Sequence, residues 1–172
     1  MKKNLLTGAA ILTLAAFSLF GCSNNKASSG TDSTQQSEPA EVTMNYITKE
    51  DLKADIDAGN NGYTILDVRK AEDYNTAHIV GAFSGDVDAA INGEDHDTAK
   101  ASLQAGLKDA TGSENGNNDS KYVLVCYSGK RYAQQATQYM IDLGIDQANI
   151  LTLEGGMTGW SEAGDDYTAL VE

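Results

Sequence analysis

The residues with the clearest chemical potential are a thiol and two cations, Cys126, Lys130 and Arg131, which lie in one short segment. The apolar run from Tyr122 to Val125 precedes the thiol and a helical pattern follows the cations, so the order predicts strand, loop and helix. A helix N-terminus and nearby cations favour the thiolate form of a cysteine, which is the nucleophile. Backbone N–H groups of such a loop can form an anion nest. The segment therefore predicts covalent catalysis on an anionic substrate.

The cysteine count leaves two interpretations of this thiol. The chain has two cysteines, Cys22 and Cys126. If Cys22 is modified, Cys126 has no disulfide partner in its own chain, and a leftover thiol in an exported protein is a candidate reactive group. The alternative is a buried structural cysteine. Two histidines, His78 and His96, and one free thiol give no metal-ligand set, so we expect no metal and no cofactor.

The N-terminus has the character of a targeting segment. Lys2 and Lys3 precede an uncharged, largely apolar stretch from Leu5 to Phe20. The stretch ends in Leu19-Phe20-Gly21-Cys22, which resembles the lipobox of bacterial lipoproteins. That resemblance implies a signal peptide over residues 1–21 and acyl chains, such as palmitate, on Cys22. Two or more chains give stable anchoring, so we expect an extracytoplasmic protein held on the bacterial membrane by lipid. An uncleaved transmembrane helix is the alternative.

Length and composition limit the number of domains and the function classes of the rest of the chain. The 172 residues suffice for one ordinary domain, and 41% hydrophobic residues fit a globular core. A net charge of −13 argues against nucleic-acid binding and against electrostatic adhesion to anionic lipid. Residues 22–43 comprise the lipidated cysteine and a polar, flexible linker. The folded domain is then expected over residues 44–172.

Strand and helix patterns alternate along this domain, which predicts an α/β fold with a central parallel sheet. Thr48 has the features of an N-cap, and Gly144 those of a helix end. Ligands in such sheets bind beyond the carboxyl ends of the strands, where Cys126 is expected. The predicted strands are 44–47, 63–68, 79–83, 121–126 and 150–153, and the predicted helices are 48–57, 71–77, 97–108, 130–143 and one turn or helix within 155–164.

Four segments in order give the chain a specific resemblance. They are Leu66-Asp67-Val68-Arg69, His78-Ile79-Val80-Gly81-Ala82, Cys126-Tyr127-Ser128-Gly129-Lys130-Arg131, and Leu153-Glu154-Gly155-Gly156-Met157 with Trp160. Together they resemble the single rhodanese domain of the sulfurtransferase family, from about residue 44 to 172. The resemblance implies a small α/β domain with helices flanking a parallel sheet, and a cysteine that cycles through a persulfide.

The resemblance also implies roles for the loop. Cys126 would be the nucleophile, and the N–H groups of residues 127–131 would stabilise the anionic persulfide. Lys130 and Arg131 are candidates for holding the oxyanion end of the donor. The alternatives are a solvated surface charge for Lys130 and a helix-surface charge for Arg131.

Three further residues invite a catalytic interpretation. Asp67 and Arg69 are expected next to the loop, and we interpret them as supporting residues, with direct chemistry as the alternative. Arg69 could form an ion pair with Glu72 that fixes the following turn. His78 could serve as a base for the thiol, but the resemblance implies packing and hydrogen bonding instead.

Loop length discriminates between chemistries. Four residues separate Cys126 from Arg131, whereas related phosphatases and arsenate reductases carry one residue more, which widens the cradle for a tetrahedral oxyanion. The shorter loop suits one sulfur atom. The chain departs from the family pattern at Phe83-Ser84-Gly85 and in the long, acidic stretch 86–120, so the rim of the site differs.

The leading hypothesis is a sulfurtransferase that takes a sulfane sulfur from a donor such as thiosulfate and passes it to cyanide or a thiol. Its expected partners are small sulfur-containing anions and thiols, with a protein acceptor as a further candidate. The alternative is a persulfide-carrying or partner-binding module with little thiosulfate turnover. A third hypothesis is a thiol redox sensor.

Overall fold

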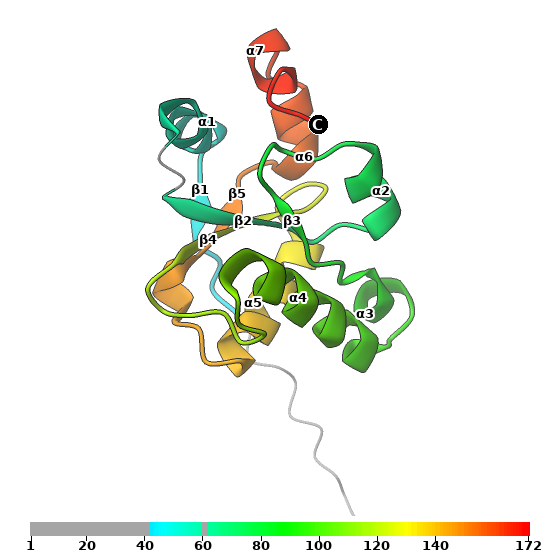
Figure 1. The fold of residues 1–172 in the computed structure, drawn as a ribbon. Coiled ribbons are helices and arrows are strands. Elements are labelled where there is room, and N and C mark those ends of the chain that lie inside the picture. The colour runs from blue at the N-terminus through cyan, green and yellow to red at the C-terminus, as the bar shows by residue number, and fades with distance from the viewer. Residues whose placement is uncertain (1–41, 60–61) are drawn as a thin grey trace, which may run out of the picture. The chain divides into compact units, whose positions relative to one another are not determined.

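One parallel sheet organises the part of the chain that the computed structural model describes, residues 42–59 and 62–172 (Figure 1). Its order is β1-β5-β4-β2-β3, and all of its pairs are parallel. This confirms the predicted α/β class. The strands are β1 (Tyr46–Ile47), β2 (Tyr63–Asp67), β3 (Phe83–Ser84), β4 (Lys121–Val125) and β5 (Ile150–Leu153).

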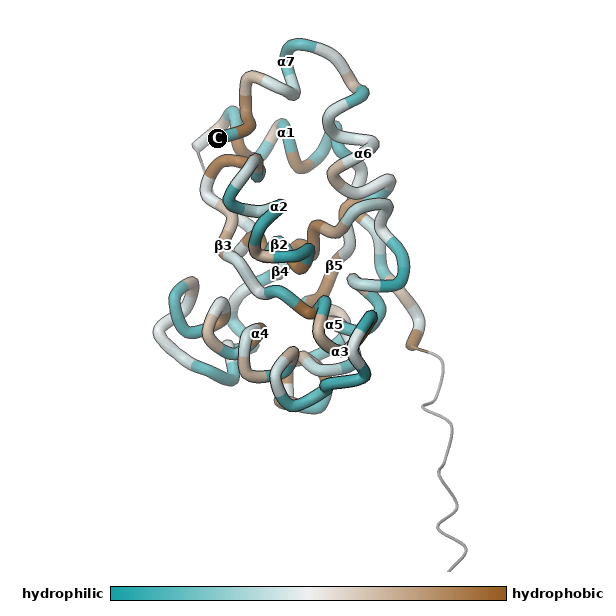
Figure 2. Tube along the Cα trace, turned by 90° about the vertical axis from the view of Figure 1, so that its right-hand side faces the viewer, coloured by the Kyte–Doolittle hydropathy of each residue, from teal (hydrophilic) through white to brown (hydrophobic). Residues whose placement is uncertain are grey.

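The strand alternation builds two cores. Side chains of successive strand residues point to opposite faces, so Tyr122 and Leu124 join one core while Val123 and Val125 join the other. Helices α3, α4 and α5 cover the first face, and α1 and α6 cover the second (Figure 1). Figure 2 shows the hydrophobic strands between hydrophilic stretches of the outer helices and loops. The helices are α1 (Lys49–Ala58), α2 (Ala71–Thr76), α3 (Asp88–Asn92), α4 (His96–Thr111), α5 (Arg131–Asp142), the 3-10 turn η1 (Gln147–Asn149), α6 (Gly156–Ser161) and α7 (Asp165–Thr168).

Short-range signals in the sequence predicted most of these elements. The Thr48 hydroxyl accepts a hydrogen bond from the Asp51 amide at 3.1 Å, which confirms the predicted cap of α1. Gly144 follows the last turn of α5 with a φ of +93°, as expected of a residue that ends a helix. Trp160 is fully buried, and its indole Nε1–H donates to the carbonyl of Tyr167 at 2.9 Å.

The predicted strand over residues 79–83 is wrong. Ile79 forms an isolated antiparallel bridge with Val171, and the Ala82 amide then closes a turn onto the Ile79 carbonyl at 3.0 Å. Gly81 takes a φ of +77° within this turn. The strand that joins the sheet therefore begins after the turn, at Phe83.

The long stretch after Ser84 folds into α3 and α4. Helix α3 was not expected from the sequence, and it buries Ala90 and Ile91 in the core that contains Tyr122 and Leu124. The predicted signal peptide, Cys22 and nearly all of the predicted linker lie outside the described residues. Among the helices that are described, none is both long and apolar enough to cross a bilayer.

Candidate functional site

Cys126 lies immediately after β4, the middle strand of the sheet. The β2 register pairs Asp67 with Val125, and the Val68 amide donates to the Val125 carbonyl at 2.8 Å. The segments that follow β2 and β4 are therefore adjacent at the carboxyl edge of the sheet. Cys126 is a free cysteine, and the residue is 1% exposed, in the same core cluster as Val68.

The loop after Cys126 rests on the start of α6. The Met157 amide donates to the Cys126 carbonyl at 2.8 Å, and the Thr158 amide donates to the Tyr127 carbonyl at 3.0 Å. A trans peptide directs its C=O and N–H to opposite sides. The N–H groups of Tyr127 and Ser128 therefore point away from α6.

Glycines make this close approach possible. A Cβ on Gly156 would lie 2.3 Å from the Cys126 carbonyl oxygen and 2.8 Å from the amide nitrogens of Ser128 and Gly129. A Cβ on Gly129 would lie 2.6 Å from the Leu153 carbonyl oxygen. Both glycines have positive φ, +57° and +71°. The Gly-Gly segment after β5 is thus the floor of the cysteine loop.

The loop amides form a set of donors without backbone partners. In the described part of the chain, no N–H group from Tyr127 to Ala133 donates to a backbone carbonyl, and Gln134 is the first, bonded to the Lys130 carbonyl at 2.9 Å. Free N–H groups at a loop and helix N-terminus are a site for negative charge. The thiol therefore lies at the start of a segment that is able to stabilise an anion.

The two loop cations occupy different places. Lys130 is exposed at the N-cap position of α5 and makes no side-chain capping bond. Arg131 is also exposed, and its Nη2 donates to the Ile91 carbonyl at 2.8 Å. The guanidinium is thus fixed at α3, and the structure places Arg131 on the rim of the site. Ser128 is exposed and Gly129 is buried.

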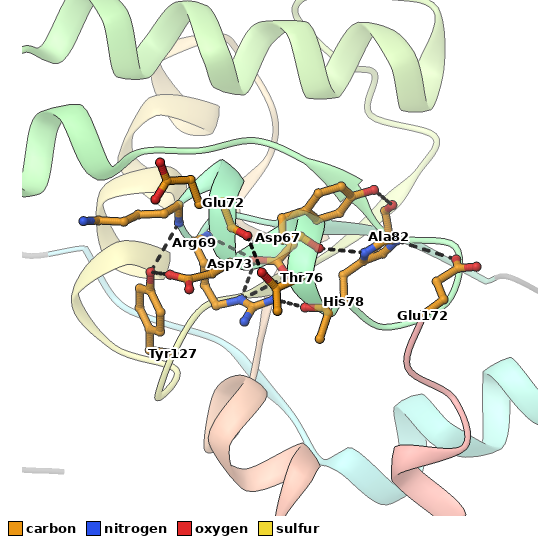
Figure 3. Close-up of polar contacts among 12 residues, drawn as sticks. Asp67, Arg69, Glu72, Asp73, Thr76, His78, Ala82, Tyr127 and Glu172 are labelled. Carbon is orange, nitrogen blue, oxygen red and sulfur yellow. Dashed lines mark hydrogen bonds and ion pairs between the residues drawn. The ribbon is translucent and has the colours of Figure 1, made fainter.

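Asp67 and Arg69 form a buried ion pair. Arg69 Nη2 lies 2.6 Å from Asp67 Oδ2, and Nε lies 3.0 Å from Oδ1. Burial alone would lower the pKa of the guanidinium, but the hydrogen bonds and charge of Asp67 outweigh it and raise that pKa. The suggested pair of Arg69 with Glu72 is wrong, because Asp67 at the end of β2 occupies the guanidinium. Arg69 also donates to the Ala77 carbonyl at 2.6 Å, which ties the end of α2 to the sheet (Figure 3).

Sequence reasoning missed a tyrosine contact between the loop and α2. The Tyr127 hydroxyl donates to the Asp73 carboxylate and accepts from the Lys70 amide at 3.4 Å (Figure 3). Its ring lies 5.9 Å from the Arg69 guanidinium. Burial, together with the hydrogen bond to Asp73, raises the pKa of Tyr127. The signal in the sequence was only a tyrosine beside the cysteine, and its partner is 54 positions away.

A second tyrosine extends this aromatic rim. Tyr132, in the first turn of α5, meets the Tyr127 ring edge to face with centroids 5.1 Å apart. Its hydroxyl donates to Asp88 at 2.5 Å, and Asn92 donates to the same hydroxyl at 3.0 Å. Burial and the hydrogen bond to Asp88 raise the pKa of Tyr132 to about 12. The rim therefore joins the loop to both α2 and α3.

His78 is held by contacts outside the loop. Its ring stacks on Tyr74 with centroids 3.9 Å apart, and Nδ1 lies 2.9 Å from the Tyr74 carbonyl. Nε2 lies 3.6 Å from the Glu172 carboxylate. These contacts agree with packing and hydrogen bonding for His78. Across residues 42–59 and 62–172, no group of three or more histidine, cysteine or carboxylate side chains is arranged to hold a metal ion.

A family model and a curated relative indicate the same family for this chain. A family described as the rhodanese-like domain matches residues 48–163. Thiosulfate sulfurtransferase GlpE of Shewanella oneidensis is 31% identical over 101 residues, which cover 58% of this chain and 76% of that protein.

Solved structures agree at the level of the fold. The rhodanese-like domain of the Anabaena sp. protein Alr3790 is 20% identical with a TM-score of 0.54, covering 76% of this chain and 80% of that one. The human single-domain sulfurtransferase TSTD1 is 21% identical with a TM-score of 0.51, covering 72% of this chain and 100% of that one.

Proposed function

This chain belongs to the rhodanese-like domain family, and we propose that it is a sulfurtransferase that carries a sulfane sulfur as a persulfide on Cys126. The observation that supports this most strongly is the loop itself: a free thiol followed by successive amides that have no backbone acceptor. The similarity to a protein named thiosulfate sulfurtransferase supports thiosulfate as the donor.

The reaction has two displacement steps. The Cys126 thiolate attacks the outer sulfur of thiosulfate, a new S–S bond forms, and the bond from that sulfur to the sulfonate breaks, with sulfite leaving with the electron pair. Cyanide or a thiolate then attacks the outer sulfur of the persulfide. The Cys126–S bond breaks, the thiolate is restored, and thiocyanate or a new persulfide leaves.

The loop amides serve both steps. The outer sulfur of the persulfide carries negative charge, and pre-aligned N–H donors stabilise such charge without reorganisation. The exposed Lys130, next to these amides, is the candidate partner for the sulfonate end of the donor. Asp67 and Arg69 support the site by fixing the β2 end and α2.

The 1% exposure of Cys126 also supports a second candidate, a persulfide-carrying module with little thiosulfate turnover. A buried persulfide is protected from small acceptors in solution. It would be released when a partner protein moves the rim. A stable persulfide that copurifies with a partner and yields no thiocyanate would favour this function.

The test uses the purified full-length chain with thiosulfate and cyanide, and Cys126→Ser as the matched variant. We expect thiocyanate from the wild type and none above the buffer rate from Cys126→Ser. Mass spectrometry of the Cys126 peptide after thiosulfate alone should show one added sulfur atom. Equal thiocyanate production by the two proteins would refute the proposal.

We also propose that lipid on Cys22 anchors the protein outside the cytoplasm, on the basis of the Leu19 to Cys22 segment. Labelled palmitate should enter the wild-type protein in bacterial cells and should not enter Cys22→Ala. Labelling of both proteins would contradict this assignment.

A further inference from the structure

Helix α2 has no N-cap of its own. Lys70 at the N-cap position makes no side-chain capping bond. The amides at the start of the helix instead donate to side chains from other segments. The Ala71 amide donates to Asp86 at 2.9 Å, and the amide of Lys70, at the N-cap position, donates to the Tyr127 hydroxyl. A helix start normally needs such acceptors. The position of α2 is therefore coupled to the cysteine loop.

Tyr127 makes this coupling through one hydroxyl. The group accepts from the Lys70 amide and donates to the Asp73 carboxylate in the first turn of α2. We call this arrangement of Tyr127, Asp73 and the Lys70 amide the tyrosine bridge (Figure 3). The Tyr127 ring also lies 5.9 Å from the Arg69 guanidinium and 5.1 Å from the Tyr132 ring, and these two neighbours restrict its position.

The loop is consequently bonded to α6, to α2 and, through Arg131, to α3. Its carbonyls at Cys126 and Tyr127 are bonded to the first amides of α6. The tyrosine bridge fixes the opposite side to α2. Cys126 is 1% exposed, so a reagent larger than a few atoms reaches the thiol only when the loop moves. The α6 attachment uses the backbone and the close fit of Gly156. Two attachments use side chains: the tyrosine bridge to α2, and the bond from Arg131 to the Ile91 carbonyl in α3.

We propose that Tyr127 is a positioning residue whose hydroxyl, bound between Asp73 and the Lys70 amide, sets the opening of the loop and so selects small sulfur donors over bulky ones. This rests on the proposed function for its sulfur chemistry, but its test does not. Tyr127→Phe removes the hydroxyl and keeps the ring. Asp73→Asn keeps an acceptor for the hydroxyl and removes the charge.

The main experiment measures alkylation of Cys126 in the full-length chain, located by peptide mass spectrometry so that Cys22 does not contribute. Two reagents are used, small iodoacetamide and a bulky fluorescein maleimide. We expect Tyr127→Phe to raise the maleimide rate about tenfold, the factor that corresponds to losing one hydrogen bond to a charged group. The iodoacetamide rate should change less than the maleimide rate.

Matched variants separate this effect from general loosening. Tyr132→Phe loses a similar hydroxyl–carboxylate bond between α5 and α3, and it should leave the ratio of the two alkylation rates unchanged. Asp73→Asn should fall between wild type and Tyr127→Phe. The double variant of Tyr127 and Asp73 should equal Tyr127→Phe alone, because both changes act on one bond. The melting temperature of each variant shows that it is folded.

The outcomes are distinguishable. If Cys126 forms no persulfide, the proposed function fails, while the alkylation ratios still test the bridge. An unchanged ratio of maleimide to iodoacetamide rates in Tyr127→Phe would overturn the proposal. A ratio raised equally by Tyr132→Phe would overturn it as well. Where turnover is present, the bridge predicts a lower KM for a bulky organic thiosulfonate in Tyr127→Phe and a nearly constant kcat.

Discussion

Replacing Gly156 by alanine tests whether the cysteine loop depends on the floor supplied by α6. The added Cβ would lie 2.3 Å from the Cys126 carbonyl oxygen and 2.8 Å from two loop nitrogens, all of them backbone atoms that cannot rotate aside. The loop must therefore move away from α6. The bond from the Met157 amide to the Cys126 carbonyl, at 2.8 Å, would lengthen with it.

The expected cost has two parts. Alanine in the left-handed region at a φ of +57° costs roughly 1–2 kcal/mol. Forced displacement of packed atoms adds roughly 1–3 kcal/mol. Gly112→Ala is the matched control, because Gly112 has a φ of +79° and no atom within 4 Å of its Cβ position. Gly112→Ala carries the same left-handed backbone cost and the same loss of entropy in the unfolded chain. The difference in the free energy of unfolding between the two variants therefore isolates the cost of displacing packed atoms, about 1–3 kcal/mol.

Urea unfolding measures this difference. Trp160 is the only tryptophan of the chain and is fully buried, so its fluorescence reports the transition, and linear extrapolation gives the free energy of unfolding. Gly156→Ala should also slow persulfide formation on Cys126, while Gly112→Ala should not. If the two variants have the same stability and the same persulfide yield, the floor assigned to Gly156 is wrong.

Three further predictions concern the ion pair, the rim and the loop cation. Arg69→Met leaves Asp67 buried without its partner, so the free energy of unfolding should fall by roughly 3–5 kcal/mol in urea titrations. A loss below about 1 kcal/mol is typical of an exposed ion pair, and it would contradict the assignment of Asp67 and Arg69 as a buried pair. Burial and the hydrogen bond to Asp88 raise the pKa of Tyr132 from its ordinary value of 10.0 to about 12, so the neutral phenol stabilises the fold fully below pH 10 and this contribution is lost as pH rises through 12. Wild-type stability should therefore fall more steeply than that of Tyr132→Phe over this range, and parallel curves would refute the assignment. Lys130→Gln should raise the KM for thiosulfate about two- to fivefold with little change in kcat, as expected for one exposed charge, and an unchanged KM would leave Lys130 as a solvated surface residue.

The sequence predicted the elements whose signals are local. The N-cap at Thr48, the β-branched and apolar strands, and the glycine after α5 each depend on residues close together in the chain. The loop between β4 and α5 was placed for the same reason. Helix α3 was not predicted, because five residues are too few to show a helical period and its stability comes from burying Ala90 and Ile91.

The features that the sequence did not predict depend on contacts between segments that are far apart in the chain. Arg69 has three nearby carboxylates in sequence, Asp67, Glu72 and Asp73, and only the position of the β2 end decides that Asp67 binds it. The strand expected around Ile79 is displaced because the C-terminal Val171 pairs there instead. The Tyr127 contact with Asp73 joins the cysteine loop to α2, and only the sheet order brings these two segments together.

The position of β4 between β5 and β2 has a consequence for local stability. Amide hydrogens of an inner strand exchange with solvent mainly when the whole domain opens, whereas short helices and loops exchange through smaller fluctuations. The thiol is therefore attached at the boundary between a well-protected inner strand and a less protected loop. Fluctuations that admit a reagent to Cys126 can occur in the loop and α2 while the strand that carries it stays intact.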